Sequence, residues 1–62
     1  MKTFVVIMEN QKTLEKIVFG EMKVKVGDIG PIIYALNSHY AIHRFEYYEK
    51  TYFKNNIENI LG

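Results

Sequence analysis

The chain has 62 residues, no cysteine and a net charge of +1, from eight basic and seven acidic side chains. This length allows only one domain, residues 1–62, and the lack of cysteine excludes a small scaffold held together by disulfides. The balanced charge also excludes a strongly basic nucleic-acid-binding domain or a charged interaction tail. Apolar residues make up 48% of the chain, enough for a packed core, although so small a domain often depends on a partner for stability.

The N-terminal region has the pattern of a strand, and its apolar run is too short for a signal peptide or a membrane span. Its apolar run, Phe4 to Met8, is followed at once by polar residues. A signal peptide needs an apolar region of about 7–15 residues, and a membrane span needs about 20. We therefore expect a cytoplasmic protein without a membrane partner, with a buried strand over residues 2–8 and a turn over residues 9–12.

Residues 13–26 predict a second strand with an interruption. Ile17 and Phe19 share one parity, and the apolar residues after Gly20 and Glu21 share the other, namely Met22, Val24 and Val26. Because strand side chains alternate with period 2, this change of parity requires either a bulge at Gly20 or a break into two short strands. Charged residues alternate with the apolar ones after the interruption, which predicts one face exposed to water. These residues are Glu21, Lys23 and Lys25.

A helix is predicted over residues 29–38. Its apolar residues recur at i, i+3, i+4 and i+7 from Ile29 to Leu36, which is the pattern of one buried helix face. Asp28 is placed to cap the helix with its carboxylate, and Pro31 falls in the expected first turn, where a missing N–H does little harm.

The C-terminal half is less uniform in pattern. Residues 40–49 fit a strand by alternation and aromatic content, or a helix by the spacing of Ala41, Phe45 and Tyr48, and we favour the strand. Residues 51–61 predict an amphipathic helix that Thr51 would cap. The expected fold is α+β, a small antiparallel sheet in the order strand–strand–helix–strand–helix with its helices packed on one face.

No catalytic motif is present, so we expect a protein that is not an enzyme and that uses no cofactor. The chain lacks a cysteine nucleophile, a paired-carboxylate motif and a phosphate-binding glycine loop. His39 and His43, with Glu46, would lie on one face of a helix as zinc ligands, but on a strand a spacing of four residues separates the histidines by about 13 Å. With residues 40–49 as a strand, we expect no metal site.

The aromatic segment that follows the helix suggests an interaction surface. Tyrosine and arginine are enriched at the centres of protein interfaces. We therefore expect a non-enzymatic protein-interaction module that forms a homodimer and binds another protein. The predicted contact residues are Tyr40, Arg44, Tyr47, Tyr48 and Tyr52.

Two further hypotheses concern the biological role. The abundance of Ile, Lys, Asn and Tyr is typical of A·T-rich genomes, and suggests a phage or mobile-element accessory protein that inhibits a host protein. The alternative function is a small nucleic-acid-binding protein, in which tyrosines stack on bases and cations pair with phosphates. The cations for that alternative are Arg44, Lys50 and Lys54.

Overall fold

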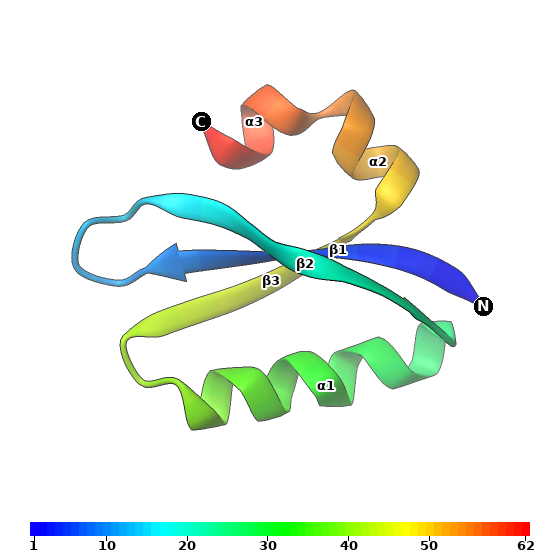
Figure 1. The fold of residues 1–62 in the computed structure, drawn as a ribbon, viewed down its shortest axis with the longest axis horizontal. Coiled ribbons are helices and arrows are strands. Elements are labelled where there is room, and N and C mark those ends of the chain that lie inside the picture. Colours follow the sequence, from blue (N-terminus) through cyan, green and yellow to red (C-terminus); the bar gives the residue numbers. More distant parts are fainter.

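A computed structural model describes residues 1–62 and has a small α+β fold (Figure 1). The elements follow one another as β-β-α-β-α-α. None of the three helices is long and apolar enough to cross a membrane. In chain order the elements are β1 (Lys2–Asn10), β2 (Lys16–Val24), α1 (Val26–His39), β3 (His43–Glu49), α2 (Lys50–Asn55) and α3 (Ile57–Leu61).

The three strands form one antiparallel sheet in the order β2-β1-β3. The expected α+β fold with an antiparallel sheet is therefore confirmed. β1 is the central strand and pairs with both neighbours, so β2 and β3 are both edge strands. This topology leaves two rows of backbone groups without a strand partner, one along the outer edge of β2 and one along the outer edge of β3.

The helices cover both faces of the sheet, so the prediction that they pack on one face is wrong. Phe4 and Val6 of β1 pack against α1, whereas Val5 and Ile7 pack against residues of α2 and α3. Figure 1 shows α1 on one side of the sheet and α2 with α3 on the other. The physical reason lies in the unbroken apolar run of β1, because successive side chains point to opposite faces and both faces must then be buried.

The first hairpin turns later than predicted. β1 continues to Asn10, and the turn comprises residues 11–13. The Asn10 side-chain oxygen accepts hydrogen bonds from the backbone N–H groups of Lys12 and Thr13, at 2.8 and 3.0 Å. Asparagine at the end of a strand thus supplies the turn that the polar residues predicted, displaced by two residues.

β2 is one continuous strand, so the break into two strands is excluded, and its bulge lies at Phe19, one residue before the predicted position Gly20. Val6 pairs with Gly20 and the next residue, Ile7, pairs with Val18, so Phe19 is the extra residue. This extra residue accounts for the change of apolar parity along β2. The backbone of Gly20 does not have a positive φ, so the bulge does not depend on the conformational freedom of glycine.

α1 begins three residues before the predicted helix. Lys25 occupies the N-cap position without a side-chain cap, so the prediction that Asp28 caps the helix is wrong, and Asp28 lies in the first turn. Pro31 lies inside the helix and has no N–H to donate to the carbonyl of Gly27, an exposed residue. The start of the helix was predicted too late because Gly27, Gly30 and Pro31 are poor helix formers.

The structure confirms a strand within residues 40–49 and divides the predicted C-terminal helix in two. β3 covers His43–Glu49, while Tyr40 to Ile42 form the connection from α1. Glu49, not Thr51, caps α2, since its carboxylate accepts the Thr51 N–H at 3.0 Å. The chain bends at Asn56, whose side chain donates to the carbonyl of Tyr52 at 2.9 Å, and α3 begins at the next residue.

Candidate protein interface

One side chain of α1 covers the edge of β3 at Phe45. The Asn37 side-chain amide donates to the Phe45 carbonyl at 3.1 Å, and its oxygen accepts the Phe45 N–H at 2.6 Å. The amide therefore takes the place that a neighbouring strand would occupy at this residue. Such a contact blocks the pairing of an exposed edge with another chain.

The same contact fixes which backbone groups of the sheet point outward. Because Phe45 directs its N–H and C=O to Asn37, its partner Met8 directs its own groups away from β3 and toward β2. The even-numbered residues of β1 therefore bond to β2. Across the ladder they meet Ile17, Gly20, Met22 and Val24, so the backbone groups of Val18, Glu21 and Lys23 point away from β1.

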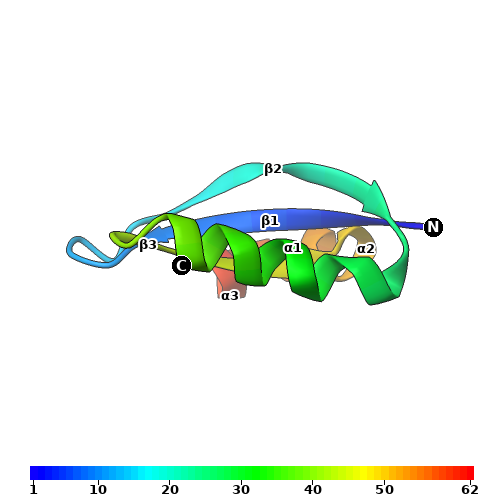
Figure 2. The ribbon, with the colours of Figure 1, turned by 90° about the horizontal axis from the view of Figure 1, so that it is seen from below.

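The edge of β2 has no such cover. None of the backbone or side-chain hydrogen bonds outside regular structure involves a residue from Lys16 to Val24. Figure 2 shows β2 along the upper margin of the molecule, with the helices on the other side of it. Its apolar side chains are also exposed, by 54% for Ile17, 47% for Val18 and 50% for Phe19.

A shallow apolar depression on α1 adds to this surface. It has a volume of about 430 Å³ and is open to solvent. Tyr40 and Phe19 both contact the ring of Phe45, with centroid distances of 5.6 and 5.1 Å. The buried ring of Phe45 thus lies between Tyr40, which lines the depression, and Phe19, which is half exposed on β2. The residues that line the depression are Ile32, Ala35, Leu36, His39 and Tyr40.

The five predicted contact residues do not form one cluster. Tyr40 contacts Phe45, and Tyr47 contacts Phe4 edge-on at 5.7 Å, so both lie on the face covered by α1. Tyr48 packs against the cluster on the opposite face and stacks on Tyr52 at 5.9 Å. Arg44 follows the parity of Tyr48, and is therefore separated from Tyr40 and Tyr47 by the sheet.

Tyr48 is a structural contact on the α2 side. Its hydroxyl donates to the carboxylate of Glu46 at 2.9 Å. Burial of the ring, followed by the hydrogen bond and the negative charge of Glu46, raises the pKa of Tyr48. The stacking on Tyr52 gives Tyr48 a role in holding β3 to α2, while its bond to Glu46 lies within β3.

The cations of the nucleic-acid alternative are also dispersed. Arg44 lies near the start of β3 and faces Glu9 on β1, while Lys50 begins α2 about 20 Å further along the strand direction. Lys50 pairs with Glu21 at 3.1 Å. Lys54 lies in the last turn of α2, so the structure does not gather the three cations into a track for phosphates.

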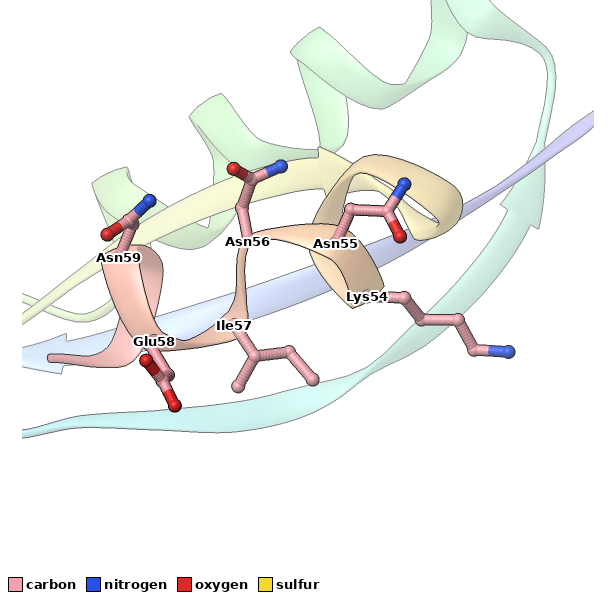
Figure 3. Close-up of a pocket in the computed structure, with 6 residues that line it drawn as sticks. All are labelled: Lys54, Asn55, Asn56, Ile57, Glu58 and Asn59. Carbon is pink, nitrogen blue, oxygen red and sulfur yellow. The ribbon is translucent and has the colours of Figure 1, made fainter.

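No cluster of three or more metal-ligating side chains is present. His39 ends α1 and His43 begins β3, and the ring of His39 lies against Tyr40 at a centroid distance of 4.8 Å. The second depression, of about 470 Å³, lies where α2 joins α3. Figure 3 shows its side chains, from Lys54 to Asn59, spreading apart instead of converging on one point.

Sequence reasoning missed both the closure of β3 and the exposed surface of β2. The exposed residues of β2 had a visible signal, since Ile17, Val18 and Phe19 are consecutive apolar residues on a strand whose other half is charged. Asn37 gave no signal, because its contact depends on how α1 crosses the sheet. The chain has no significant match among protein-family models, curated proteins or solved structures.

Proposed function

We propose that this protein is a non-enzymatic interaction domain that binds a partner protein by adding a strand of the partner to β2. The observation that carries the proposal is the asymmetry of the two edges. Asn37 occupies the edge of β3, whereas the edge of β2 combines open backbone groups with exposed Ile17, Val18 and Phe19. Strand addition uses main-chain hydrogen bonds for affinity and side-chain contacts for specificity.

The apolar surface beside β2 supports a partner of particular chemistry. A strand paired with β2 would direct alternate side chains to the face that carries Phe19 and the depression on α1. An extended segment with apolar residues at alternate positions fits this surface best. This site differs from the one predicted from the sequence. Of the five predicted contact residues, only Tyr40 lines the depression.

The biological setting is part of the proposal. We keep the hypothesis of a cytoplasmic accessory protein of a phage or mobile element, with the bound partner a host protein that it inhibits. Its ground is the composition of the chain, rich in Ile, Lys, Asn and Tyr. The proposal is non-enzymatic because Lys54 and Glu58, the acid and base of the larger depression, form no ion pair, and the depression on α1 contains no carboxylate, serine or cysteine.

The test is a pull-down with the tagged protein and a Val18→Pro variant, from a lysate divided into nuclease-treated and untreated halves. The N–H of Val18 points outward, so proline removes a donor from the edge while the bonds to β1 remain. We expect a protein that the wild type retains in both halves and that the variant loses. Tyr34→Ser, which alters an exposed aromatic side chain on α1, is the matched control and retains it.

Two outcomes contradict the proposal. Equal retention by the wild type and Val18→Pro, with both folded by circular dichroism, would exclude strand addition at β2. Loss of all bound material after nuclease treatment would instead favour the nucleic-acid alternative.

A further inference from the structure

We propose that the β2 edge also binds a second copy of this chain, in an antiparallel pairing with its two-fold axis at Met22. The two three-stranded sheets would then form one continuous sheet. This inference rests on the proposed function only in using the same open edge. It commits to one partner and one register, and both follow from the charges and the backbone geometry of β2.

The regular part of the open edge has its centre at Met22. The bulge at Phe19 interrupts the strand on one side, and β2 ends at Val24 on the other, just before α1 begins at Val26. A regular ladder cannot continue through a bulge. The longest regular stretch available for pairing is therefore Gly20–Val24, which is symmetric about Met22.

The backbone groups of this stretch suit a two-fold pairing. Glu21 and Lys23 direct their N–H and C=O groups outward, whereas Met22 bonds to Phe4 of β1. With the axis at Met22, Glu21 of each copy lies opposite Lys23 of the other. Each of these two pairs can exchange both backbone hydrogen bonds, which is the arrangement of an antiparallel ladder.

The side chains select the same register. Both Glu21 and Lys23 are exposed and lie on the face opposite α1, so the pairing brings a carboxylate against an ammonium group twice. Moving the axis by one residue places Glu21 on Glu21 or Lys23 on Lys23, which are repulsive pairs. Opposite charges at both flanks of the axis therefore make Met22 the favoured centre.

The surroundings leave room for a second copy. β2 lies along the margin of the molecule, away from the helices (Figure 2). The ion pair of Glu21 with Lys50 is about half exposed and lies on the same face, so Glu21 can face Lys23 of the second copy without leaving Lys50 far from its charge. Because only a short stretch pairs, we expect a weak dimer with a dissociation constant on the order of 0.1 mM.

The test is a charge exchange, read by analytical ultracentrifugation over a range of protein concentrations up to about 1 mM, well above the expected dissociation constant. Glu21→Lys alone and Lys23→Glu alone each create two repulsive cross-strand pairs, and each should weaken dimerisation by about tenfold or more. The double exchange, Glu21→Lys with Lys23→Glu, restores opposite charges and should restore the dimer. It also keeps the net charge of the wild type, so the result does not depend on total charge.

A mixture of the two single variants gives the sharpest readout. In this pair every cross-strand contact joins opposite charges, so we expect a heterodimer where each variant alone is monomeric. Lys50→Gln is the control for loss of the ion pair with Glu21, and it should leave dimerisation nearly unchanged.

Several outcomes would overturn the inference without touching the proposed function. One is a wild type that stays monomeric at the highest concentration. Another is self-association that the single charge reversals do not weaken, or that the double exchange does not recover. A host protein retained through β2 by a monomeric wild type would leave the proposed function intact and remove the homodimer.

Discussion

The two edge strands, β2 and β3, differ in how their outer backbone groups are covered, although both pair with the central strand β1. On β3, the side chain of Asn37 bonds to both backbone groups of Phe45, and α2 follows directly at the end of the strand. On β2, the outward backbone groups have no partner and the apolar residues before the bulge are half exposed. An edge strand left open in this way is a template for pairing, so natural domains usually block it or use it.

Two phenylalanines show the difference at the level of single residues. Phe19 on β2 and Phe45 on β3 contact each other edge-on, at a centroid distance of 5.1 Å. Phe45 is 2% exposed and belongs to the core under α1, whereas Phe19 is 50% exposed. Of the two rings in contact, Phe45 therefore contributes mainly to stability, whereas Phe19 forms part of the exposed surface.

The largest expected effect comes from truncating these two rings. Phe45→Ala should destabilise the fold by about 3–5 kcal/mol, because it leaves a cavity in the core. Phe19→Ala should cost only about 1 kcal/mol, because half of its ring is already in water. Urea unfolding followed by circular dichroism measures both. Similar losses for the two variants would contradict the contrast between the strands.

A milder substitution at Phe45 keeps the comparison measurable if Phe45→Ala does not fold. For a domain of this size, a loss of several kcal/mol approaches the whole stability. Phe45→Leu keeps an apolar side chain and should cost less than Phe45→Ala but more than Phe19→Leu. That order is what the difference in burial between the two rings requires.

The second prediction removes the closure of β3. Asn37→Leu deletes both hydrogen bonds to Phe45 and should lower the free energy of unfolding by about 1–2 kcal/mol. It also opens a second edge, so self-association should increase. Thermal unfolding and ultracentrifugation measure the two effects. Ser38→Ala, which removes one exposed hydrogen bond to the Tyr34 carbonyl, is the neighbouring control and should change little.

The sequence carried enough information for the elements but not for the way in which they close the sheet. Periodicity located all three strands and the apolar stripe of α1. The same patterns also indicated that helices cover both faces of the sheet. From Phe4 to Ile7 the side chains that point to either face are apolar, and all of them are buried. A fold with helices on one face would have left Val5 and Ile7 in water.

The candidate interface was less accessible to prediction. Composition pointed to tyrosines after α1, but the alternation of β3 sends Tyr47 and Tyr48 to opposite faces, so they cannot share one surface. The role of Asn37 arises from the crossing of α1 over β3, eight residues away from its partner in the sequence. Such a contact is a property of the tertiary fold and leaves no local pattern.

The third prediction concerns the bulge that divides the open edge. A Cβ atom at Gly20 would meet no heavy atom within 4 Å, and the residue does not have a positive φ. Gly20→Ala should therefore raise stability by about 0.5 kcal/mol, through the smaller conformational entropy of the unfolded chain. Urea unfolding is again the measurement. A clear loss of stability would show that the bulge requires glycine and that the edge of β2 is more constrained than its open surroundings indicate.

The smallest effect is a change of the Tyr48 pKa at the end of β3 where α2 begins. Burial of Tyr48, with its hydrogen bond to Glu46, raises the pKa of the phenol in the folded protein above that in the unfolded chain. The stability from this shift is complete below the ordinary tyrosine pKa and is lost as the pH rises through the pKa of the folded state. Unfolding free energies at alkaline pH should therefore decline from the ordinary tyrosine range upward.

Glu46→Gln separates the two causes of this shift. The variant removes the carboxylate charge but keeps the burial of the ring, which is the largest cause, so the pKa of Tyr48 should fall only part of the way toward its ordinary value. NMR titration of labelled tyrosine rings follows the pKa of Tyr48 in the wild type and in the variant. If Tyr48 in the wild type titrated at the ordinary tyrosine pKa, this end of β3 would be open to water, and the contrast between the two edges would rest on Asn37 alone.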